Sequence, residues 1–117
     1  MRTFRRISLV VLVVAIGAWL AVSATVSVAA ITGHVRMVQN PTTHKYRFKP
    51  GTISVHKGDT VVWNNKSNAP HTVTFNNGSY SKTVQPGGHV SRTFRKRGTF
   101  GYHCNIHPYM HGSVTVT

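Results

Sequence analysis

The stretch GTFGYHCNIHPYMHG, residues 98–112, joins a strand-like run to a loop rich in metal-binding side chains. It holds the chain's only cysteine, three of its eight histidines and one of its three methionines. Cys104, His107 and Met110 follow one another at the spacing C-x2-H-x2-M. Thiolate, imidazole and thioether are ligands for soft and intermediate metals, so this loop predicts part of a metal site. A single loop rarely supplies a whole site, and at least one further ligand is expected upstream.

A second segment, WNNKSNAPHTV at residues 63–73, offers that ligand. It ends one predicted strand, crosses a loop and presents His71 at the start of the next strand. Together the two segments provide two imidazoles, one thiolate and one thioether, which is the donor set of copper electron-transfer sites. Zinc more often takes a fourth strong ligand in a tetrahedron, and a thioether is a poor one.

The region after Gly33 is expected to be all-β, because short runs of Val, Thr, Ile and aromatic residues alternate with turn residues rich in Gly, Pro and Asn. Such frequent short strands predict a β-sandwich. The predicted strands are His34–Val38, Tyr46–Phe48, Thr52–His56, Thr60–Asn64, His71–Phe75, Tyr80–Val84, His89–Phe94, Gly98–Cys104 and Gly112–Val116.

Three motifs together resemble the cupredoxins, the blue copper proteins that include plastocyanin and azurin. FKPGTISVHKGDTVVW at residues 48–63 is similar to the family's early strand pair, and residues 63–71 have the spacing of its first ligand loop. The C-x2-H-x2-M loop is most similar to the short loop of the amicyanin branch. The resemblance covers Tyr46–Thr117 and implies a Greek-key β-sandwich of about eight strands with one type 1 copper ion.

The resemblance also implies roles for individual residues. The copper ligands would be His71, Cys104 and His107, with Met110 as the axial ligand. Asn65 takes the place of an asparagine that ties the two ligand loops together, and such outer residues orient ligands. One departure is Asn105, where the family often has Ser or Thr, so the hydrogen bond between the loops is expected to run differently. The electron-transfer surface would consist of Ala69, Pro70, His107, Pro108 and Tyr109.

These residues predict a one-electron carrier in which copper cycles between Cu(II) and Cu(I), with electrons leaving through His107. Its partners would be redox proteins that bind through small, transient interfaces. The alternative is a copper storage or delivery protein. An enzyme is not expected, because related copper enzymes need further histidine pairs and the chain has no His-x-His sequence.

Residues 1–30 have the pattern of a secretory signal, with Arg2, Arg5 and Arg6 before an uncharged, largely apolar stretch over residues 7–30. An uncleaved membrane anchor is the alternative, since roughly 20 apolar residues span a bilayer. Either way the domain, residues 31–117, is expected outside the cytoplasm, in the periplasm or an equivalent compartment. A monomer is the default expectation.

Charge is strongly lopsided: 14 Lys and Arg accompany a single acidic residue, Asp59, for a net charge of +13. Such a field favours acidic partners. No nucleic-acid motif accompanies it, and the export signal argues against nucleic acid as a partner. The one tight basic cluster is Arg92 with residues 95–97, which is either a solvated turn or a docking patch.

Overall fold

The computed structural model describes Gly17 and residues 29–117, so the predicted signal or anchor lies almost wholly outside the described residues. Within that described part, no helix is long and apolar enough to cross a membrane. Nine strands follow from residue 32 onward: β1 Thr32–Gln39, β2 Tyr46–Lys49, β3 Thr52–Val55, β4 Thr60–Asn65, β5 His71–Phe75, β6 Ser81–Val84, β7 His89–Thr93, β8 Gly98–His103 and β9 His111–Val116.

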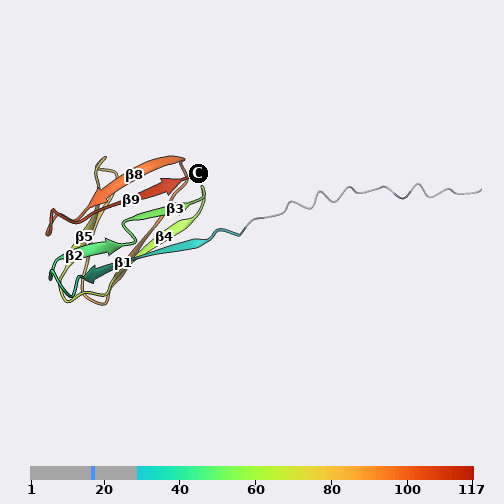
Figure 1. The fold of residues 1–117 in the computed structure, drawn as a ribbon. Helices are drawn as coiled ribbons and strands as arrows, with labels where there is room; N and C mark the ends of the chain where they lie inside the picture. The colour runs from blue at the N-terminus through green and yellow to red at the C-terminus, as the bar shows by residue number, and fades with distance from the viewer. Residues whose placement is uncertain (1–16, 18–28) are drawn as a thin grey trace, which may run out of the picture.

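The strands form two sheets that face each other as a sandwich (Figure 1). One sheet has the order β2-β1-β4-β7 and the other the order β3-β9-β8-β5-β6. The β1–β4 and β3–β9 pairs are parallel, while the remaining pairs are antiparallel. The all-β, cupredoxin-like sandwich predicted from the sequence is confirmed.

Alternation along the strands explains where the core lies. In β4 every second residue is buried, so Val61, Trp63 and Asn65 face the other sheet while their neighbours are partly exposed. The Trp63 ring lies edge-on to Phe75 at 6.0 Å and to Tyr102 at 5.4 Å between ring centroids. Aromatic pairs at these separations add stability beyond the area that they bury.

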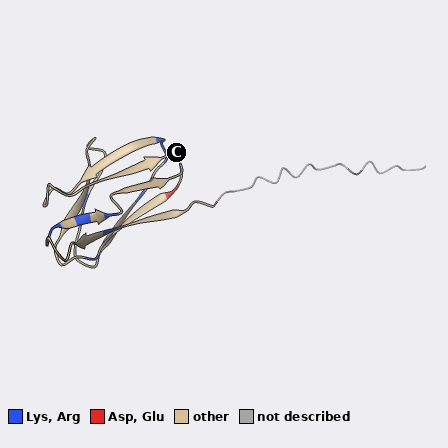
Figure 2. Ribbon diagram, in the orientation of Figure 1, with Lys and Arg blue, Asp and Glu red and all other residues tan. Residues whose placement is uncertain are grey.

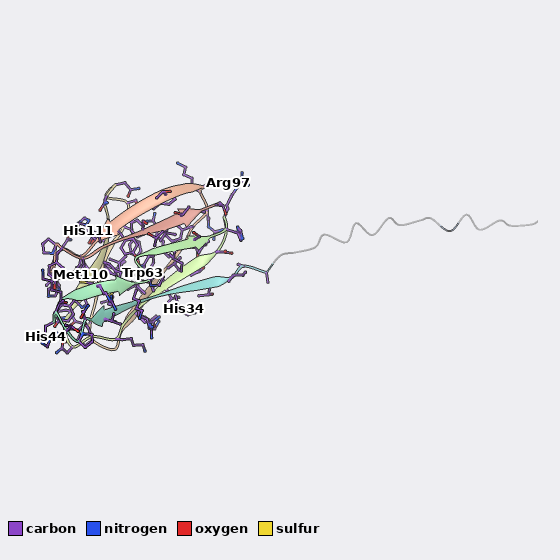
Figure 3. All side chains as sticks on the ribbon, viewed as in Figure 1. His34, His44, Trp63, Arg97, Met110 and His111 are labelled. Atoms are coloured by element: carbon purple, nitrogen blue, oxygen red, sulfur yellow. The ribbon has the colours of Figure 1, made fainter. Side chains whose placement is uncertain are left out.

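The core changes character toward one end of the sandwich. There the inward positions of β4 and β5 are Asn65 and His71, and the residue that follows β8 is Cys104, all fully buried. The loops after these strands, residues 66–70 and 104–110, belong to this end. Figure 3 shows Met110 and His44 at this end of the sandwich. Arg97 lies at the opposite end, close to residues 29–31.

The close packing of the Tyr102 side chain against Gly112 can be tested directly. A Cβ at this position would lie 2.4 Å from Cζ and 2.5 Å from the hydroxyl oxygen of Tyr102. We therefore expect Gly112→Ala to lower the free energy of unfolding by about 1–3 kcal/mol, the usual cost of overpacking. Urea denaturation of the metal-free chain measures it. Gly51→Ala is the control, because a Cβ there meets nothing within 4 Å; equal losses in both variants would contradict this packing.

Candidate metal centre

Three donor atoms from the two loops converge at this end of the sandwich. The Nδ1 atoms of His71 and His107 lie 3.1 Å apart, and each lies 3.9 Å from Sγ of Cys104. All the candidate donor atoms of these three residues lie within 4.8 Å of one another. His71 and Cys104 are buried, whereas His107 is partly exposed. The structure thus brings together the three strong ligands expected from the sequence.

Backbone hydrogen bonds close the loop that carries most of these donors. The amide of Cys104 donates to the carbonyl of Met110 at 3.1 Å, and the amide of Met110 donates to the carbonyl of His107 at 2.9 Å. β8 and β9 continue directly from this closure, with His103 paired to His111. Met110, only 1% exposed, is therefore held in the same short loop as Cys104 and His107.

The sulfur of Cys104 accepts two backbone hydrogen bonds. The amide of Thr72 donates to Sγ at 3.3 Å, and the amide of His107 donates at 3.4 Å. Thr72 follows His71 and belongs to β5, whereas His107 belongs to the loop over residues 104–110. Both ligand-bearing segments therefore donate a hydrogen bond to the same sulfur. Hydrogen bonds to the cysteine sulfur tune the redox potential of copper centres.

The other ring nitrogen of His71 is held by a chain of hydrogen bonds. Nε2 of His71 lies 2.7 Å from Oγ of Ser67, and that hydroxyl donates to Oδ1 of Asn65 at 2.7 Å. Since the hydroxyl proton is used toward Asn65, Oγ accepts from Nε2–H. This assigns the proton of a neutral imidazole to Nε2 and leaves Nδ1 free as a ligand.

Asn65 works differently from what the resemblance implied. Its Nδ2 donates to the carbonyls of Ala69 at 2.7 Å and Val84 at 3.0 Å, while Oδ1 accepts from the amide and hydroxyl of Ser67. Among the described residues, none of these bonds reaches the loop over residues 104–110. Asn65 therefore shapes the first ligand loop and anchors it to β6, and it touches His71 only through Ser67.

The two loops are instead tied together by threonine hydroxyls. The amide of Asn105 donates to Oγ1 of Thr72 at 2.8 Å, and Nδ2 of Asn105 donates to Oγ1 of Thr74 at 3.1 Å. The side chain that departs from the family pattern thus reaches across to β5. In this chain the link between the loops therefore runs through Asn105, Thr72 and Thr74.

Tyr46 is a site residue that sequence reasoning missed. Its ring lies 4.8 Å from that of His71 and 4.7 Å from that of His107, centroid to centroid. Its hydroxyl donates to Oδ1 of Asn68 at 2.7 Å, and its amide donates to the hydroxyl of Tyr109 at 3.1 Å. Tyr46 therefore contacts both imidazoles and both loops. No local pattern marks it, because its partners are distant in sequence.

The donor set fits a copper ion. Metal bonds of roughly 2 Å to nitrogen and 2.3 Å to sulfur allow one ion to reach all three atoms of a triangle with sides of 3–4 Å. Nδ1 of His71 carries no proton, and the sulfur already faces two amide donors, so the ligands are prepared for a cation. A buried thioether from Met110 completes a set that suits copper better than zinc.

The residues predicted to surround His107 are exposed to different degrees. Pro70 and Pro108 are exposed, Ala69 is partly exposed, and Tyr109 is 47% exposed. Ile106, which was not predicted, is also 47% exposed and lies in the same loop. Lys45 lies over the ring of Tyr109, with Nζ 5.7 Å from its centroid.

Comparison with known proteins agrees with this site. Residues 11–116 match the family model described as a cupredoxin-like domain. The chain is 35% identical to amicyanin from Paracoccus denitrificans over 78 residues, covering 62% of this chain and 60% of that protein. It is 30% identical to plastocyanin from Scenedesmus fuscus over 83 residues, covering 59% of this chain and 85% of that protein. The chain thus spans about three fifths of the amicyanin that it matches.

Solved structures give the same result. A reduced amicyanin variant superimposes with a TM-score of 0.62 at 31% identity, covering 75% of this chain and 82% of that one. A purple cupredoxin from Nitrosopumilus maritimus gives a TM-score of 0.65 at 23% identity, covering 73% and 99%, and supports the fold alone. The chain belongs to the cupredoxin family. With His71, Cys104, His107 and Met110 gathered at one end, it is a copper-binding member.

The metal-free site makes stability depend on pH. Burial, and then the nearby His107, lower the pKa of His71 from 6.5 to about 4. Between pH 6.5 and about 4, His71 is therefore mostly protonated in the unfolded chain and mostly neutral in the folded chain. We expect the free energy of unfolding of the metal-free chain to fall between pH 6.5 and about 4. Urea denaturation across this range measures it, and an undiminished fall in His71→Gln would contradict the assignment.

The hydroxyl of Ser67 can be tested separately. Ser67→Ala removes the acceptor for Nε2 of His71, and loss of such an outer partner usually lowers metal affinity by about 10–100-fold. Ser67→Thr keeps a hydroxyl and should retain most of the affinity. Competition with a Cu(I) chelator gives both values. Equal affinities for the Ala and Thr variants would show that the hydroxyl does not orient His71.

Proposed function

We propose that this chain is a one-electron carrier between redox proteins outside the cytoplasm, in which His71, Cys104, His107 and Met110 would hold a type 1 copper ion. Bound copper supplies a Cu(II)/Cu(I) couple. The observation that carries the proposal is the enclosed site: His71 is 0%, Cys104 0% and Met110 1% exposed, and only His107 reaches the surface. An enclosed site with one exposed ligand is suited to electron exchange through that ligand.

The protein's part in this function is to keep the ligands still. Amides from Thr72 and His107 hold the sulfur, Ser67 holds the ring of His71, and Tyr46 packs on both imidazoles. A preorganised ligand frame lets the redox state change with little rearrangement. This role requires no acid, base or nucleophile, so we propose a carrier and not an enzyme.

His107 is the side chain through which the electron enters and leaves. Its partly exposed ring sits in the apolar collar formed by Ala69, Pro70, Pro108 and Tyr109. A small apolar contact suits a transient complex that must form and separate quickly. Lys45 and Lys66 are exposed in the loops around the collar and favour a partner with an acidic docking surface.

A copper storage or delivery protein remains the second candidate, since it would need the same ligands. Delivery requires a ligand that an acceptor can reach and displace, and here three of the four are buried. The relatives named amicyanin and plastocyanin, and the resemblance on which the carrier role was predicted, also favour the carrier.

Electron exchange with small charged reagents tests the docking charge. We expect the rate with ferricyanide, an anion, to fall as salt rises, and the rate with a cationic cobalt complex to rise. The double variant Lys45→Gln/Lys66→Gln should lower the rate of electron exchange with ferricyanide and weaken the salt dependence of that rate. Arg36→Gln/Lys82→Gln removes the same charge from exposed strand positions and should change it less. Rates that do not change with salt concentration would contradict a steering role for these charges.

The same loaded protein separates the carrier from the delivery candidate. A carrier should keep its copper through repeated oxidation and reduction in the presence of a moderate Cu(I) chelator. Rapid transfer of copper to the chelator on every reduction would favour delivery instead.

A further inference from the structure

Several basic residues lie at the end of the sandwich opposite the metal centre, close to residues 29–31. We propose that this end docks on the anionic headgroups of a membrane, which turns the copper end away from the lipid surface. The proposal concerns orientation at the membrane and goes beyond the electron-carrier function.

The cations at this end come from two turns. Lys57 lies between β3 and β4, and Arg95, Lys96 and Arg97 lie between β7 and β8. All four are exposed. Lys57 and Arg97 line one hollow of about 580 Å³ together with Ile31, which places them beside the emerging chain. The four residues are called the basic end below.

A second hollow lies at the same turn. Its volume is about 230 Å³, and Arg92, Arg95 and Lys96 line it together with Asn77 and Ser79. The guanidinium of Arg92 is fixed over aromatic rings, with its carbon 4.3 Å from the centroid of Phe75, and Nη2 donates to Oγ of Ser79 at 3.2 Å. A positioned guanidinium beside two exposed cations is suited to phosphate oxygens.

The chain has a single acidic side chain, Asp59, which lines the same hollow as Lys57 and Arg97. Asp59 accepts hydrogen bonds from the amides of Ile31 at 3.0 Å and His56 at 2.9 Å. These bonds lower the pKa of Asp59 and hold its carboxylate against the backbone. Figure 2 shows this single acidic position in red at the end where the chain emerges. One carboxylate cannot balance the four cations, so the basic end keeps a net positive charge that attracts anionic groups outside the protein.

An anionic bilayer is favoured over an acidic protein because of what precedes Ile31. Residues 7–30 carry no charge, and Ile31 itself is 61% exposed at the base of the sandwich. An apolar segment that entered a bilayer would bring the basic end to the headgroup level. Each Lys or Arg within a Debye length of such a surface is attracted to its anionic headgroups.

Lysine labelling of the full, copper-loaded chain in vesicles tests the proposal. We expect an acetylating reagent to modify Lys57 and Lys96 about threefold or more slowly in vesicles containing phosphatidylglycerol than in pure phosphatidylcholine. Lys45 and Lys66, at the copper end, should react equally in both. High salt should abolish the difference, because headgroup attraction is screened.

Paired variants keep both reporter lysines in place. Arg95→Gln/Arg97→Gln should remove most of the protection at Lys57 and Lys96. Arg36→Gln/Arg47→Gln, which removes two exposed charges from β1 and β2, should retain it. Equal labelling in both vesicle types would overturn the proposal and leave the basic end for an acidic protein. Protection of Lys45 and Lys66 instead would reverse the orientation and also overturn it. Neither result bears on redox activity.

Discussion

Everything at the metal centre depends on one constraint: the sulfur of Cys104 must meet two imidazole nitrogens from different loops without being free to move. Two backbone amides that donate hydrogen bonds to the sulfur meet this constraint. Thr72, which follows His71, and His107 each direct a backbone N–H at the sulfur. Because these donors belong to the segments that carry the histidines, fixing the sulfur also fixes the ligands around it. The sandwich supplies the rigid strand ends on which this arrangement rests.

The same arrangement explains why two polar side chains, Asn65 and His71, are fully buried at the copper end. Asn65 and His71 occupy inward strand positions that would hold apolar side chains in an ordinary sandwich core. Each is satisfied: Asn65 through Ala69, Val84 and Ser67, and His71 through Ser67. Buried polar groups cost stability unless they are paired, so these bonds are a condition of folding as much as of function. Positive charge occurs at both ends, with Lys45 and Lys66 exposed at the copper end and the basic end at the opposite pole.

Much of this could be predicted from the sequence because the signals are local. Turn residues and β-rich runs placed all nine strands, and the spacing of Cys104, His107 and Met110 within one loop identified the metal centre. Contacts set by tertiary packing were harder. Tyr46 lies 22 and 63 residues from its hydrogen-bond partners, so no window of sequence contains the contact. Asn65 was expected to link the two loops, yet its side chain bonds to Ser67, Ala69 and Val84, while Thr72 and Asn105 form the link.

An optical spectrum of the chain after addition of Cu(II), before and after ascorbate, tests the central claim most directly. The account predicts an intense visible charge-transfer band from the Cys104 thiolate, which bleaches on reduction and returns on reoxidation. Cys104→Ser should abolish the band. A protein that stays colourless, or binds Cu(II) without that band, would show that Cys104 is not a ligand and would contradict the electron-carrier account.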